Sequence, residues 1–126
     1  MRAIVATLLL AAATAVAEPQ RRVTIWHPHV VSPAVVRVWD GDTFDAGDER
    51  VRLRGVDAPE RGSPGADAAA RRLRELLRQG PVTIVPRAED AYGRTVADVY
   101  VAGVNVAAVL AAEGLATVRT RRGRND

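Results

Sequence analysis

Acidic residues gather in the stretch VWDGDTFDAGD, residues 38–48. Asp40 and Asp42 flank Gly41, and Asp45 and Asp48 follow shortly after. Asp-Gly between β-branched and aromatic residues predicts a β-hairpin, because glycine tolerates the positive φ of a type I′ turn. A tight turn does not require so many carboxylates. We therefore ask whether this is a solvated hairpin or whether one of its acids holds a ligand.

Two further polar stretches exceed what turns require. They are RLRGVDAPE, residues 52–60, and DAYGR, residues 90–94. Carboxylates that lie close together repel one another, and a divalent cation between them removes that cost. The chain has no cysteine and these stretches contain no histidine, so an oxygen-binding ion such as calcium fits them better than zinc.

The chain has a formal charge of +3, and all 18 of its basic residues are arginine. A coding bias accounts for the lack of lysine, and the net charge alone does not indicate a polyanionic partner. Arginine is nevertheless the side chain that binds phosphate oxygens through two parallel hydrogen bonds.

The elements that must position these residues are predicted by periodicity. Strands are expected over 34–39 and 43–47, and over 50–56, where Val51 and Leu53 alternate with arginines and Arg52 is left free to reach outward. A helix is expected over 66–79, with Glu75 paired to Arg71 and to Arg78.

Two more strands, over 82–85 and 95–101, and a second helix complete the expected domain. Asn105 is the expected N-cap of that helix, and Gly114 follows its C-terminal end. Three strands, a helix, two strands and a helix do not alternate as βαβ units do. The order predicts an α+β fold, a small five-stranded OB-fold β-barrel with two helices.

The first 17 residues have the pattern of a secretory signal peptide, with cleavage expected near Ala17. The mature protein is then expected to be secreted or periplasmic, and a monomer by default. Residues 18–33 form an irregular lead-in, in which VTIW, residues 23–26, could add a short edge strand. His27 and His29 are expected on the surface rather than as a metal-binding pair. Residues 34–118 form the domain, and 119–126 a basic tail.

Together, in this order and spacing, DGDT, RLRGVDAPE and DAYGR resemble the thermonuclease, or staphylococcal nuclease-like, family. The resemblance runs from about Val35 to Val118. It implies an OB-fold enzyme that hydrolyses phosphodiester bonds of DNA and RNA with Ca²⁺ and little base preference, leaving 3′-phosphate ends. It also answers the opening question: Asp42 is expected to bind an ion, while Asp45 and Asp48 are expected to be solvated turn residues.

The resemblance also assigns roles to particular residues. The calcium ligands correspond to Asp42, Asp57 and the backbone carbonyl of Ala58. The acid taken as general base, or as the holder of the attacking water, corresponds to Glu60.

The family's phosphate-binding residues complete the expected site. Its two arginines correspond to Arg52 and Arg94, and a tyrosine beside the nucleotide corresponds to Tyr92. Arg54 shares the polar face of its strand with Arg52, and the family match decides for Arg52.

The sequence departs from the family pattern at three places. Ala58 stands where threonine is frequent, and a tyrosine on which a base can stack falls at about Thr120. Family members continue into a third helix, for which this sequence has no residues after Asp126; we expect that difference to bear on stability more than on chemistry. A non-catalytic OB-fold module that binds nucleic acid stays open as the alternative, and a small sugar- or protein-binding barrel would leave the charged residues unexplained.

Overall fold

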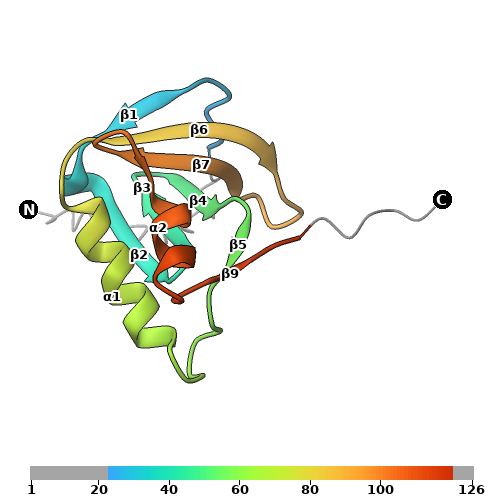
Figure 1. Cartoon of the computed structure of the whole chain (residues 1–126). Coiled ribbons are helices and arrows are strands. Elements are labelled where there is room, and N and C mark those ends of the chain that lie inside the picture. Colours follow the sequence, from blue (N-terminus) through green and yellow to red (C-terminus); the bar gives the residue numbers. More distant parts are fainter. Residues whose placement is uncertain (1–22, 121–126) are drawn as a thin grey trace, which may run out of the picture.

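The computed structural model of the chain describes residues 23–120 (Figure 1). The expected signal peptide and most of the basic tail lie outside the described residues. Within them, no helix has the length and apolar character needed to cross a membrane. The elements follow the order β1 (His29–Val31), a 3₁₀ turn (Pro33–Val35), β2 (Val36–Asp40), β3 (Thr43–Ala46), β4 (Glu49–Leu53), β5 (Val56–Asp57), α1 (Ala66–Leu77), β6 (Val82–Glu89), β7 (Thr95–Val101), β8 (Val104–Asn105), α2 (Val106–Ala112) and β9 (Thr117–Val118).

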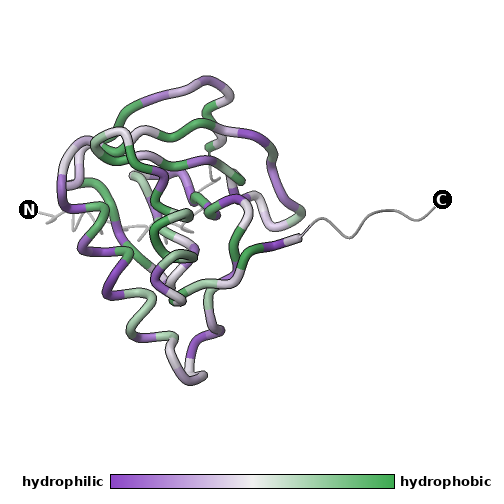
Figure 2. The backbone as a smooth tube through the Cα atoms, in the orientation of Figure 1, coloured by the Kyte–Doolittle hydropathy of each residue, from purple (hydrophilic) through white to green (hydrophobic). Residues whose placement is uncertain are grey.

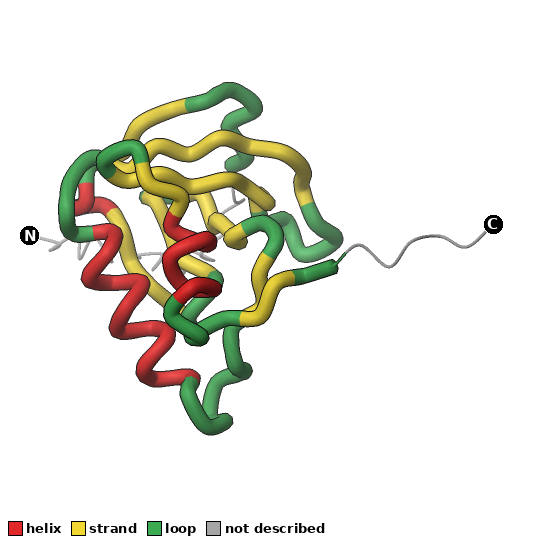
Figure 3. Tube along the Cα trace, viewed as in Figure 1, coloured by secondary structure: helices red, strands yellow, loops and turns green. Residues whose placement is uncertain are grey.

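The strands form one curled sheet with the order β1-β6-β7-β4-β3-β2, and β8 pairs with β7. All pairs are antiparallel except β4 and β7, which run parallel with Val51 opposite Thr95. A second, short sheet joins β5 to β9, so the end of the described chain returns to the residues after β4. Figure 3 shows the two helices on one side of the curled sheet. The expected α+β, OB-fold-like architecture is confirmed.

Aliphatic side chains and one phenylalanine fill the core between the sheet and the helices. Phe44 and Leu53 from the sheet are fully buried, as are Leu73 of α1 and Leu110 of α2. Along α1 the hydropathy alternates between apolar and polar, as expected for a helix with one buried face (Figure 2). Asn105 caps α2 by accepting the N–H of Ala108, as its sequence predicts.

Gly41 is required by close packing and not by its backbone angles, so the expected type I′ turn is wrong. Gly41 is absent from the glycines of positive φ. A Cβ added at this position would lie 2.6 Å from the Cβ of Ala69 and 2.7 Å from the Cβ of Ala58. The β2–β3 turn therefore rests directly on α1 and on the loop after β5, and this contact sets the position of Asp42.

The buried carboxylate of Glu49 holds the N-terminal lead-in against the sheet, a contact that the sequence does not predict. Glu49, which lies between two of the expected strands, begins β4 and is only 3% exposed. Its Oε2 accepts the backbone N–H of Ile25 and the hydroxyl of Thr95, and its Oε1 lies 2.8 Å from Nε2 of His29. The expectation that His29 is a surface residue is therefore wrong. The short edge strand that the sequence left open at VTIW does not form, because pairing with β6 begins only at His29.

The ion pairs of α1 also differ from expectation. Glu75 pairs with Arg72, at 3.2 Å, and not with Arg71 or Arg78. Arg72 in turn binds Glu113, beyond the end of α2, at 2.8 Å, so this arginine joins the two helices. Spacing along a helix permits several pairs, and here the neighbouring helix selects the one that forms.

Candidate active site

One open cleft of about 1110 Å³ collects the polar stretches that the sequence singles out. Its walls come from the β2–β3 turn, the chain from β4 through the loop after β5, the β6–β7 loop and the residues after β9. All seven predicted site residues line it: Asp42, Arg52, Asp57, Ala58, Glu60, Tyr92 and Arg94. Segments more than 50 residues apart in sequence therefore meet at one place.

Arg52 lies at the floor of the cleft and is tightly held. Its Nη1 donates to the carbonyls of Leu53 and Val56, both at 2.7 Å, and its Nη2 donates to Asp57 at 2.5 Å. The same Nη2 lies 3.5 Å from Asp42. The expectation that Arg52 is free to reach outward is wrong, because the chain turns at Gly55, with φ of 84°, and folds back over it. Only 8% of Arg52 is exposed.

Asp42 is held in the cleft by hydrogen bonds to both of its carboxylate oxygens. One of its oxygens accepts the N–H of Ala58 at 2.9 Å, and the other accepts the hydroxyl of Thr43. Burial raises the pKa of Asp42 above its ordinary value, and the neighbouring Asp40 adds to that rise. The Ala58 N–H and the charge of Arg52 oppose it. A positive charge beside Asp42 would thus be stabilising.

The donor set of the cleft suits a hard cation. Asp42 and Asp57 lie on the same guanidinium group, and no histidine or cysteine is among the lining residues. Within residues 23–120, no three Asp, Glu, His or Cys side chains are arranged so that they alone could hold a metal ion. Calcium takes six to eight oxygen ligands, so two carboxylates and the Ala58 carbonyl would need water or a substrate oxygen to complete the shell.

The cleft is also lined by Arg94, which the β6–β7 loop positions. Asp90 accepts the N–H groups of Tyr92 and Arg94 and also the Nε–H of Arg94, at 2.6 Å. The Arg94 guanidinium lies over the Tyr92 ring, 5.4 Å from its centroid. Partial burial acts to raise the pKa of Asp90, but these hydrogen bonds outweigh it, and the pKa lies below its ordinary value.

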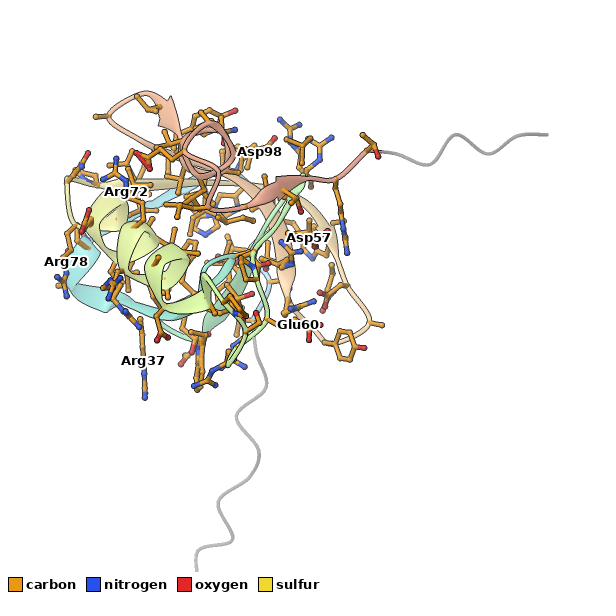
Figure 4. The ribbon with its side chains drawn as sticks, turned by 60° about the horizontal axis from the view of Figure 1, so that its bottom comes forward. Arg37, Asp57, Glu60, Arg72, Arg78 and Asp98 are labelled. Atoms are coloured by element: carbon orange, nitrogen blue, oxygen red, sulfur yellow. The ribbon has the colours of Figure 1, made fainter. Side chains whose placement is uncertain are left out.

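Two groups in the cleft are available for a ligand. The Nη atoms of Arg94 make no hydrogen bond with the described residues. The side chain of Glu60, which is exposed on the loop after β5, likewise has no partner among them. Figure 4 shows Asp57 and Glu60 on the same side of the molecule. The cleft therefore offers a fixed cationic group, a forked donor and an unpaired carboxylate.

Comparison with known proteins agrees with this arrangement. The family model described as staphylococcal nuclease homologue matches residues 50–126. The chain belongs to the staphylococcal nuclease family. The matched residues include Arg52, Asp57, Glu60 and Arg94, whereas Asp42 precedes them.

Curated proteins from bacteria and plants match part of the chain. The chain is 41% identical over 70 residues to the micrococcal nuclease of Shigella flexneri, covering 52% of this chain and 40% of that protein. It is 35% identical over 89 residues to an uncharacterized endonuclease of Escherichia coli O157:H7, covering 67% and 58% respectively. A probable staphylococcal-like nuclease of Oryza sativa subsp. japonica is 37% identical over 67 residues, covering 53% of this chain and 20% of its own. The chain thus spans between a fifth and three fifths of these relatives.

Residues beyond the family motifs also build the cleft of this staphylococcal nuclease family member. Arg119, assigned from sequence to a basic tail, donates its Nε–H to Asp57 at 3.0 Å and its backbone N–H to Gly55. Asp98 of β7 holds both Arg54 and Arg87, at 3.2 and 2.8 Å. Sequence patterns gave no signal for these contacts, because each joins residues that come together only when β4, β6, β7 and β9 assemble.

Proposed function

We propose that this protein is a calcium-dependent nuclease that hydrolyses phosphodiester bonds of DNA and RNA with little base preference. The supporting observation is that both arginines, both carboxylates, the Ala58 carbonyl, Glu60 and Tyr92 line one cleft in a member of the staphylococcal nuclease family. Phosphate is common to all bases and both sugars, so a site that binds it should discriminate weakly among sequences.

The proposed mechanism assigns a separate task to each wall. A calcium ion held by Asp42, Asp57 and the Ala58 carbonyl would withdraw negative charge from a phosphate oxygen. Glu60, exposed and unpaired among the described residues, accepts the proton of the attacking water or holds that water in place.

The two arginines stabilise the charge that develops on the phosphate. Arg94 uses its unengaged Nη groups as a fork, because Asp90 occupies only its Nε–H. Arg52 keeps a fixed positive charge beside the carboxylates, because two backbone carbonyls hold its Nη1. Donors that are already oriented contribute most to catalysis, since they need not rearrange during the reaction.

The finer features of the proposal rest on the family resemblance and on the N-terminal sequence. The products carry 3′-phosphate ends, and the protein is exported after cleavage near Ala17. Both are open to direct measurement. Polymerase extension of the products should require prior phosphatase treatment, and mass spectrometry of the mature protein should give Glu18 as its first residue.

The deciding experiment measures cleavage of single-stranded DNA in calcium and in EGTA. Wild-type protein should cut only with calcium, and Glu60→Gln should lose about 10²–10⁴-fold in rate while remaining folded. Glu89→Gln is the matched control, because Glu89 is also exposed and without a partner among the described residues but lies outside the cleft. DNA binding without cleavage would replace the proposal with a non-catalytic binding module, and cleavage in EGTA would contradict the role of calcium.

A further inference from the structure

The arginines of the described residues fall into two groups that differ in their partners. Seven form ion pairs with carboxylates: Arg50, Arg52, Arg54, Arg72, Arg87, Arg94 and Arg119. The remaining five have no acidic partner within residues 23–120: Arg37, Arg61, Arg71, Arg74 and Arg78. All five unpaired arginines line two adjacent surface pockets.

These two pockets define what we call the β2–α1 face. One pocket, of about 240 Å³, lies between β2 and the C-terminal half of α1, and its charged lining is Arg37, Arg74 and Arg78 alone. The other, of about 330 Å³, holds Arg61, Arg71 and Arg74, together with Asp40 and Asp67. In Figure 4, Arg37 and Arg78 extend outward on the side away from Asp57 and Glu60. The face thus carries five arginines and two acids.

The arrangement on α1 is unfavourable for the protein alone. Arg71, Arg74 and Arg78 follow at spacings of three and four residues, so they lie along one stripe of the helix. Like charges at these spacings repel one another and destabilise a helix. The helix dipole favours Arg74 and Arg78 near the C-terminal end. It does not favour Arg61, which precedes the N-terminal end, so a polyanion explains the whole set better.

Arg37 is held on this face by an aromatic ring. Its guanidinium carbon lies 5.2 Å from the centroid of Trp39, and that of Arg50 lies 4.4 Å from the same ring. Asp45, expected to be a solvated turn residue, instead accepts the indole N–H of Trp39 and the Nε–H of Arg50. This contact with Asp45 fixes the ring, and the ring restrains Arg37.

The face is continuous with the cleft. Asp40 lines both the cleft and the pocket containing Trp39, and Arg74 lines both pockets of the face. From Arg71 to Arg78 the helix rises about 10 Å, a length along which one strand of a DNA duplex carries about three phosphates. A nucleic acid strand that leaves the cleft past Asp40 would therefore meet a row of unpaired arginines.

We infer that the β2–α1 face binds the sugar-phosphate backbone of the nucleic acid beyond the bond that the cleft hydrolyses. The occupant rests on the proposed function, because the face adjoins a site proposed to cut that polymer. The cleft itself is lined by six acids and four arginines, so it is poorly suited to attract a polyanion without a metal ion. The face supplies the affinity that the cleft lacks.

The test measures DNA binding without cleavage. Fluorescence anisotropy of a labelled single-stranded oligonucleotide is recorded in EGTA over a range of salt concentrations. The Arg74→Gln/Arg78→Gln variant should bind more weakly, and its slope of log K against log salt should fall by about 1.4, since each lost contact with a single strand contributes about 0.7. Arg74→Lys/Arg78→Lys should restore most of the slope, because lysine also neutralises phosphate.

The matched control removes the same charge elsewhere. Arg72→Gln/Arg87→Gln loses two arginines that lie outside both pockets, and should keep the wild-type slope. Equal salt slopes for the two glutamine variants would overturn the inference, because net charge alone would then account for the salt dependence of DNA binding. Thermal melting followed by circular dichroism verifies that each variant is folded.

A second readout separates this inference from the proposed function. The face variant should raise KM for long single-stranded DNA and leave kcat/KM for a dinucleotide unchanged, because a dinucleotide does not reach the face. If the wild-type protein never cuts DNA but the face variant has a smaller salt slope, the inference about the β2–α1 face is supported and the proposed nuclease function is rejected. If the wild-type protein cuts DNA but the face variant has the same salt slope and the same KM for long DNA, the nuclease function is supported and the inference about the β2–α1 face is rejected.

Discussion

The cleft and the β2–α1 face use the same side chain in opposite ways. Every arginine lining the cleft is bound to a carboxylate, whereas those of the face have none among the described residues. Paired arginines lose freedom and gain orientation, which suits chemistry on one phosphate. Unpaired arginines keep their charge available, which suits binding of many phosphates. The difference divides catalysis and affinity between two regions.

Among the changes that test this division, the largest effect is expected at Arg94 in the cleft. Arg94→Gln should lower the rate of DNA cleavage by about 10²–10³-fold, since one oriented donor to a developing oxyanion is worth that much. Its binding of DNA in EGTA should change little, because the face is intact. Arg87→Gln is the control, as Arg87 lies outside the cleft. Cleavage rates are measured on gels and DNA binding by fluorescence anisotropy. If Arg94→Gln lost as much DNA binding as cleavage rate, catalysis and affinity would not be divided between the two regions.

A next, smaller effect should follow from filling the space at Gly41. In Gly41→Ala, the new methyl group would overlap Ala58 and Ala69, so the β2–β3 turn must move and take Asp42 with it. Overpacking of this kind costs about 1–3 kcal/mol of unfolding free energy, and cleavage should fall with it.

Gly80→Ala is the control for that substitution, because its added Cβ meets nothing within 4 Å and its φ is ordinary. Urea unfolding and cleavage rates measure both variants. If Gly41→Ala were as stable and active as Gly80→Ala, the close contact would not be what positions Asp42.

The comparison can also be reversed by converting paired arginines into unpaired ones. Asp98 holds Arg54 and Arg87, and Asp98→Asn would release both from its charge. DNA binding in EGTA should become several-fold tighter and its salt slope steeper. Asp48→Asn removes the same charge from an exposed residue outside the cleft and face. An equal gain for both variants would show that net charge, and not release of the two arginines, sets the affinity.

The sequence predicted most of what is local. The bounds of β7, the cap at Asn105 and the assembly of DGDT, RLRGVDAPE and DAYGR at one place could be read from periodicity and motif order. The family resemblance supplied the roles, which the described contacts leave to experiment.

Long-range pairing could not be predicted in the same way. Alternation along β4 indicated which face Arg52 occupies, but not that the chain would fold back over it. Nothing in the sequence indicated that Glu49 is buried or that Arg119 belongs to the cleft, because their partners are 20 or more residues away. The β2–α1 face was hidden for the same reason. Arg72 binds Glu113 across 41 residues, and only then does it become clear that Arg71 and Arg78 are left over.

The smallest expected effect concerns how the cleft holds its own charges as the pH falls. The pKa of Asp90 lies below the ordinary value of 3.8, because the hydrogen bonds of Arg94 and Tyr92 outweigh the burial of the carboxylate. A depressed folded-state pKa means that the unfolded chain binds the proton first. The stability from Asp90 is therefore complete above about pH 4 and is lost as the pH falls through the lower folded value.

In Asp90→Asn the stability contributed by the ionised Asp90 carboxylate, and its dependence on pH, should be missing. The difference in stability between wild type and variant should shrink steadily below about pH 4, as measured by urea unfolding at successive pH values. Glu89→Gln, next to it on β6 and without an ion pair among the described residues, should leave the acid limb unchanged. So should Arg74→Gln/Arg78→Gln, because the arginines of the face have no described carboxylate to lose. If the unfolding free energy of that face variant depended on pH below about pH 4 differently from wild type, its arginines would have a carboxylate partner. The distinction between the two regions would then be lost.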